Sequence, residues 1–60
     1  MYIPEDPAML LSMINMKLRD GGYASFDDLC RALDLDGEAI KARLAEAGFE
    51  YMPAPVNQFR

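Results

Sequence analysis

The chain has 60 residues, and ten aspartates and glutamates outnumber six lysines and arginines, which gives a formal charge of −4 at pH 7. Such a length provides one small core, and this acidic balance has the wrong sign for a domain that coats phosphate groups. The sequence has no histidine and one cysteine, Cys30, so the side chain best suited to proton transfer near neutral pH is missing.

The sequence also indicates a compartment. No stretch approaches the roughly 20 apolar residues that a membrane-spanning helix needs. The start, Met1 to Glu5, lacks the basic residues and the apolar core of a signal peptide, and a single thiol fits a reducing environment. We therefore expect a cytoplasmic protein that folds as a single domain over residues 1–60.

The first predicted helix covers about residues 6–20. Asp6 offers an N-cap acceptor, Pro7 occupies the first helical position, where proline costs nothing, and Gly21 and Gly22 end the helix. At about 100° per residue the helix has two apolar faces. One face comprises Leu10, Leu11, Ile14 and Leu18. The nearly opposite face comprises Met9, Met13 and Met16.

The next two predicted helices cover about residues 25–34 and 36–47, and together they indicate a helix-turn-helix. Ser25 and Asp36 are their N-caps, with Asp28 as a short capping-box acid. On the surface we expect Asp27 to pair with Arg31. The predicted inward residues are Phe26, Leu29, Cys30 and Leu33 in the first of these helices, Leu35 in the turn, and Ile40, Leu44 and Ala47 in the second.

The C-terminal segment, residues 48–60, is predicted to be extended or to form a short β-hairpin around its Pro-Ala-Pro turn. We expect it to lie across the first helix. Asn15 would form an amide hydrogen bond to Asn57 or Gln58, with Phe59 as the apolar anchor. The alternative is that Asn15 points to water and the terminus frays. The predicted fold is thus a mostly α, three-helix domain with a short extended or hairpin C-terminus.

Several short motifs carry a resemblance over essentially the whole chain. They are Asp6-Pro-Ala-Met-Leu-Leu-Ser12, Asn15, Lys17-Leu-Arg-Asp20, Leu29-Cys30, Gly48-Phe-Glu-Tyr51 and Asn57-Gln-Phe59. In combination they resemble the short bacterial domain-of-unknown-function family numbered 4250. The sequence departs from that family at its Pro-Ala-Pro insert and at Gly21-Gly22. The resemblance implies membership of a family without implying an activity, a substrate or a cofactor.

No residue pattern indicates catalysis, a cofactor or a metal ion. Ser12, Ser25 and Cys30 lack an obvious activating base, and the apolar neighbours of Cys30 indicate an inert structural thiol. The Asp27-Asp28 pair lies on a solvated helix face, and Asp34 and Asp36 have ordinary turn and cap roles. We expect a protein that is not an enzyme.

Two functions remain open. The face formed by Met9, Met13 and Met16 favours a non-catalytic protein-interaction or homodimerisation module, unless the C-terminal tail covers it. The alternative is a DNA-binding regulator that uses the helix-turn-helix, with Lys41 and Arg43 as the candidate nucleic-acid contacts. One lysine beside a glutamate cannot neutralise the roughly six to ten phosphates that such binders engage, so nucleic acid is the less favoured partner.

Overall fold

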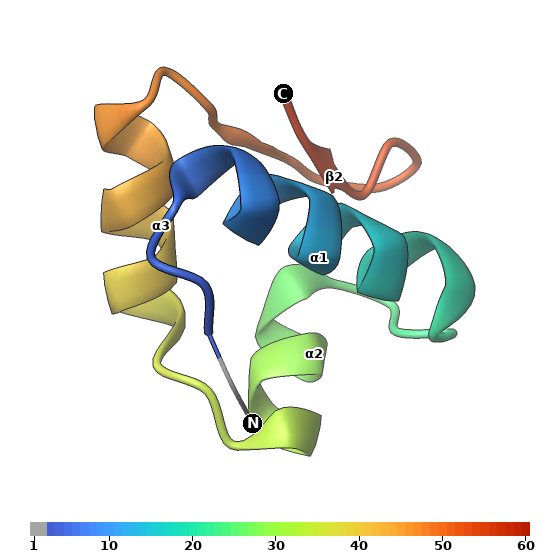
Figure 1. Ribbon diagram of the computed structural model, residues 1–60. Helices are drawn as coiled ribbons and strands as arrows, with labels where there is room; N and C mark the ends of the chain where they lie inside the picture. Colours follow the sequence, from blue (N-terminus) through green and yellow to red (C-terminus); the bar gives the residue numbers. More distant parts are fainter. Residues whose placement is uncertain (1–2) are drawn as a thin grey trace.

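The computed structural model describes residues 3–60, so residues 1 and 2 of the predicted domain lie outside the described part of the chain. Three helices are followed by a two-stranded antiparallel hairpin (Figure 1). The elements are α1 (Pro7–Asp20), α2 (Phe26–Leu33), α3 (Gly37–Glu46), β1 (Tyr51–Met52) and β2 (Gln58–Phe59). The mostly α fold predicted from the sequence is confirmed, with the hairpin as the form of its C-terminus.

Each helix begins at a polar side chain that accepts a hydrogen bond from a backbone N–H of the first turn. Asp6 Oδ1 accepts from Ala8 N at 2.9 Å. Ser25 Oγ accepts from Asp28 N at 3.2 Å, and Asp36 Oδ1 accepts from Ala39 N at 3.2 Å. These bonds satisfy donors that have no partner inside the helix, so the three helix starts are local properties of the sequence.

The surface ion pair of α2 differs from the one predicted. Arg31 pairs with Asp28, three residues earlier, and the predicted pairing with Asp27 is wrong. Residues three and four apart lie on the same side of a helix, so sequence spacing alone does not choose between the two acids. The Asp28 carboxylate accepts a hydrogen bond from Arg31, and the backbone N–H of Asp28 donates to Ser25 Oγ.

Two residues with positive φ turn the chain after α2 and α3. Asp34, with φ of 57°, ends α2, and Leu35 N donates to Cys30 O at 2.8 Å, which turns Leu35 back toward the core. Gly48 has φ of 91°, and beyond it Phe49 N donates to Leu44 O at 2.9 Å. Glycine adopts this left-handed conformation without a steric cost from Cβ.

The core is formed by one face of each helix and by the second strand. Its buried residues are Leu10, Ile14, Leu18, Phe26, Leu29, Cys30, Ile40, Leu44 and Phe59. Leu11, Leu33 and Leu35 are only partly buried at its edge. Ala47 was predicted to face inward and is exposed, because α3 ends at Glu46 and the chain leaves the helical path at that point.

The hairpin lies alongside α1 (Figure 1). Tyr51 faces Phe59 and Met52 faces Gln58, while Glu50 and Arg60 exchange two backbone hydrogen bonds of 2.9 Å. The Phe59 ring is buried and meets the Phe26 ring edge-on, with 4.9 Å between ring centroids. The last strand therefore closes the core between α1 and α2.

Candidate interaction surface

The three methionines of α1 have different environments. Met9 and Met16 keep 60% and 55% of their surface exposed, whereas Met13 is partly buried and packs against the core. Met13 lies about 40° around the helix from Met9, on the side of Leu10. Met9 and Met16 are two turns apart on one side of α1, with the exposed Ser12 between their turns. The candidate surface is therefore the α1 outer face, which we define as Met9, Ser12 and Met16.

The C-terminal tail is held at Asn15, away from the centre of the α1 outer face. Asn15 Nδ2 donates to Phe59 O at 3.0 Å, and Phe59 N donates to Asn15 Oδ1 at 2.8 Å. Gln58 Nε2 also donates to the backbone O of Asn15 at 3.1 Å. Because Phe59 directs its N–H and C=O away from β1, the Asn15 amide occupies the second edge of β2. Met9 and Met16 stay exposed.

Asn57 connects the hairpin to the start of α2. Its Oδ1 accepts a hydrogen bond from the Tyr51 hydroxyl, and its Nδ2 donates to Tyr23 O at 3.1 Å. The Tyr51 hydroxyl in turn accepts from Phe26 N at 3.3 Å, which satisfies the first N–H of α2. The structure thus brings together the four predicted tail-anchor residues, Asn15, Asn57, Gln58 and Phe59, and adds Tyr23 and Tyr51, whose participation no local sequence signal indicates.

A hollow adjoins the α1 outer face. It lies between α1 and the end of the chain and is lined by Leu11, Ser12, Asn15, Met16, Arg19 and Gln58. Met16 therefore belongs both to the exposed face and to the wall of this hollow. Sequence reasoning missed the hollow because Gln58 reaches it only through the hydrogen bonds that dock the tail on Asn15.

The two cations that were candidate nucleic-acid contacts are both engaged within the chain. Lys41 Nζ lies over the Phe26 ring, 5.6 Å from its centroid. Arg43 Nη1 donates to the backbone O of Glu5 at 3.2 Å. The two side chains therefore contact different parts of the molecule, and the exposed side of α3 beside them carries Glu38, Ala42 and Ala45.

We expect no measurable affinity for random-sequence duplex DNA at about 0.15 M salt, because the net charge is negative and both cations have contacts within the protein. Fluorescence anisotropy with a labelled duplex measures this. Micromolar or tighter binding that weakens steeply as salt is raised would contradict the prediction.

A comparison with protein-family models finds a match over nearly the whole chain. The family model described as "Domain of unknown function (DUF4250)" matches residues 4–59. The chain belongs to the DUF4250 family. This confirms the resemblance drawn from its motifs. No curated protein and no solved structure matches the DUF4250 chain.

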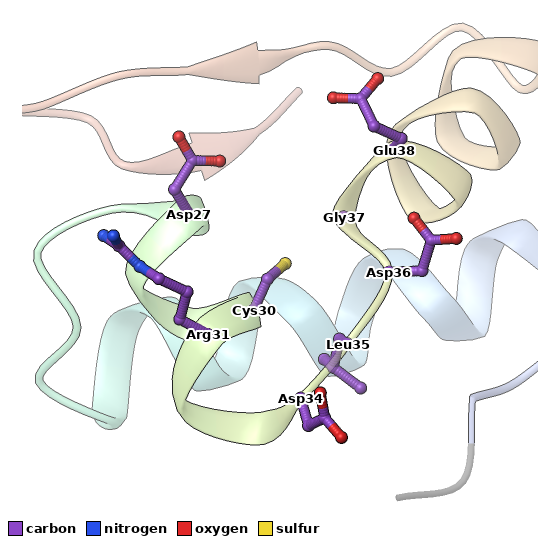
Figure 2. Close-up of a pocket in the computed structure, with 8 residues that line it drawn as sticks. All are labelled: Asp27, Cys30, Arg31, Asp34, Leu35, Asp36, Gly37 and Glu38. Atoms are coloured by element: carbon purple, nitrogen blue, oxygen red, sulfur yellow. The ribbon is translucent and has the colours of Figure 1, made fainter.

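A second hollow of the DUF4250 chain lies between α2 and α3. Its lining residues are Asp27, Cys30, Arg31, Asp34, Leu35, Asp36, Gly37 and Glu38. Figure 2 shows the Cys30 sulfur directed toward the start of α3, while the four carboxylates are spread around the rim and do not converge. Within residues 3–60, no group of histidine, cysteine and acidic side chains is arranged to hold a metal ion.

Cys30 is a buried free thiol, and Gly37 packs directly against it. A Cβ atom at position 37 would lie 3.1 Å from the Cys30 sulfur, so glycine permits the close approach of α3. Burial is the main cause that raises the pKa of the Cys30 thiol, and the negative charge of Asp27 adds to it. We therefore expect the Cys30 thiol beside this hollow to be protonated and unreactive near neutral pH.

Cys30 is expected to react with a thiol reagent at pH 8 at least about tenfold more slowly in the folded DUF4250 chain than in urea.

The raised pKa of the Cys30 thiol also makes the stability of the fold depend on pH. The folded state retains a proton that the unfolded state loses, so this contribution is complete below the unfolded pKa and is lost as pH rises through the folded pKa. Melting temperatures above about pH 8.5 should thus fall less steeply in Cys30→Ala than in wild type. Equal slopes would contradict this.

No helix within the described residues of the DUF4250 chain has the length and apolar composition needed to cross a lipid bilayer.

Proposed function

We propose that this protein is a non-catalytic interaction module, and that the α1 outer face is the surface through which it binds another protein chain. The observation that carries this proposal is the exposure of Met9 and Met16 at 60% and 55%. A chain of 60 residues has little apolar surface to spare for anything but its core. Here two large apolar side chains are left outside the core on one side of a single helix.

The chemistry of the surface supports the same conclusion. Methionine is flexible and polarisable, so it adapts to the shape of a partner better than branched side chains do. The α1 outer face is contiguous with the hollow lined by Leu11 and Gln58, which provides relief into which partner side chains can pack. Scattered apolar side chains are ordinary on protein surfaces. The α1 outer face differs in that two exposed methionines lie on one side of a helix beside a hollow, which supports a contact site.

The remaining chemistry of the chain favours binding over catalysis. The sequence has no histidine, and the one thiol is buried with a raised pKa. A free thiol also fits a reducing compartment, so we propose that the protein binds its partner in the cytoplasm. Nucleic acid is the less favoured partner, because Lys41 and Arg43 already have contacts within the protein and the chain is acidic overall.

A site-specific photo-crosslinking experiment tests the proposal. A photoreactive amino acid replaces Met16, and a matched control carries it at Ala42, an exposed position of α3. After irradiation in the cells from which the chain comes, we expect adducts at position 16 in which mass spectrometry identifies the linked protein. The same adducts should disappear in a chain that also carries Met9→Asp. Adducts at position 16 that do not exceed those at position 42 would refute the proposal.

A further inference from the structure

We propose that Met9 and Met16 are sites of reversible oxidation, at which a peroxide changes the α1 outer face from an apolar to a polar surface while the protein stays folded. The modification depends on the environments of the methionines within this chain. Its consequence for a bound partner rests on the proposed function. Three features carry it: the exposure of these two side chains, the packing of Met13 on the same helix, and the hydrogen-bond donors around Met16.

Exposure decides which methionines a dissolved oxidant reaches. Met9 and Met16 keep 60% and 55% of their surface exposed. Met13, on the same helix, is partly buried and packs against the core. Met52, in β1, is also partly buried. A peroxide must contact the thioether sulfur in order to react, so Met9 and Met16 should react first, and Met13 provides a reference on the same helix.

The reaction needs only the thioether and the oxidant. A lone pair of the sulfur attacks one oxygen of hydrogen peroxide, an S–O bond forms, and the O–O bond breaks. The proton on the attacked oxygen passes to the departing hydroxide, which leaves as water. The sulfur is oxidised by two electrons to a sulfoxide, and the peroxide is reduced. The sulfoxide is polar, whereas the thioether that it replaces is flexible and apolar.

The fold accommodates the two sulfoxides because neither side chain belongs to the core. At Met16 the new oxygen also has hydrogen-bond donors nearby. Ser12 and Arg19 line the same hollow as Met16, about one turn before it and one turn after it. Arg19 donates from Nε and Nη2 to Asp20, and its Nη1 carries two further N–H donors. At Met13, by contrast, the same oxygen would enter the packing against the core.

Oxidation acts on the feature that supports the proposed function. The α1 outer face is a candidate contact surface because two large apolar side chains are exposed on it, and each sulfoxide replaces apolar surface with polar surface. A partner that packs on the thioethers therefore binds the oxidised face more weakly. Methionine sulfoxide reductases reverse the change: two thiols of a reductant become a disulfide, and the sulfoxide oxygen leaves as water.

Peptide mapping by mass spectrometry after treatment with hydrogen peroxide tests the selectivity. We expect Met9 and Met16 in the folded chain to form sulfoxide at least about fivefold faster than Met13, and the three rates to agree within about twofold in urea. The chain oxidised at both exposed positions should melt within about 8 °C of the untreated chain. Methionine sulfoxide reductases A and B with dithiothreitol should return both residues to the thioether.

Met9→Leu combined with Met16→Leu is the matched control, because leucine keeps both positions apolar without a sulfur. On a hydrophobic-interaction column, peroxide should shift the wild-type chain to earlier elution several-fold more than it shifts the double variant. Circular dichroism confirms that the variant is folded.

The outcomes distinguish this inference from the proposed function. Equal rates at positions 9, 13 and 16 in the folded chain, unfolding on oxidation, or equal elution shifts in wild type and the double variant would each overturn the inference. Where the chain with a photoreactive residue at position 16 forms specific adducts, peroxide should reduce them several-fold, and Met9→Leu should preserve them. Selective oxidation in a chain that forms no specific adduct would refute the proposed function alone.

Discussion

Replacing Phe59 with alanine is expected to lower the free energy of unfolding by about 3–5 kcal/mol. Phe59 is 3% exposed. The centroid of its ring lies 4.9 Å from that of the Phe26 ring and 5.3 Å from that of the Tyr51 ring. Truncation removes buried apolar surface and leaves a cavity where three elements meet. A domain of this size has little stability in reserve, so the variant should be largely unfolded at 25 °C. Urea titration followed by circular dichroism measures the loss.

Phe59→Leu is the matched control, because it retains an apolar side chain while removing the ring contacts. Leucine is smaller than phenylalanine but fills much more of the space than alanine does, so we expect a smaller loss of stability than in Phe59→Ala and a chain that stays folded. If Phe59→Ala instead melts within a few degrees of wild type, the hairpin does not close the core, and the packing of the Phe59 ring contributes nothing to stability.

Replacing Asn15 with alanine is expected to destabilise the fold by about 2–3 kcal/mol. The change removes both hydrogen bonds to the Phe59 backbone and leaves an N–H and a C=O of β2 without their partner. In a domain this small, each kcal/mol shifts the melting temperature by about 4–8 °C, so a loss of roughly 8–24 °C should follow. Thermal unfolding followed by circular dichroism gives the shift.

Hydrogen exchange makes the Asn15 test specific. The Phe59 amide donates to Asn15 Oδ1, so its exchange should accelerate in Asn15→Ala more than that of the Arg60 amide, which donates to Glu50 O. Ser12→Ala, one turn earlier on the exposed side, should change stability by no more than about 0.5 kcal/mol. Unchanged protection of the Phe59 amide would show that Asn15 does not hold the tail.

The helices could be predicted from the sequence because their signals are local. Asp6, Ser25 and Asp36 each accept from a backbone N–H two or three residues away, so the cap and the helix it starts lie in the same short stretch. The leucine face of α1 follows from helical periodicity in the same way. Leu10 and Ile14 are fully buried, as the period requires.

The details that the sequence could not provide depend on packing between distant segments. A hydrogen bond between Asn15 and an amide side chain of the tail was expected, and Gln58 Nε2 does donate to the backbone O of Asn15. The sequence did not show that the Asn15 side chain itself bonds to the Phe59 backbone, 44 residues away. Periodicity grouped Met13 with Met9 and Met16, because helical angle alone does not say how far around α1 the rest of the protein reaches. The hollow beside Met16 depends on the docked tail in the same manner.

The pairing of Asn15 with Phe59 also protects the protein from unwanted association. A hairpin with two-residue strands has two open edges, and an open edge is a template on which a strand of another molecule can add. The Asn15 side chain occupies that position on β2 and supplies the donor and the acceptor that an invading strand would supply. One helical amide thereby blocks β-sheet growth from this edge, the first step toward aggregation, without the chain having to form a third strand.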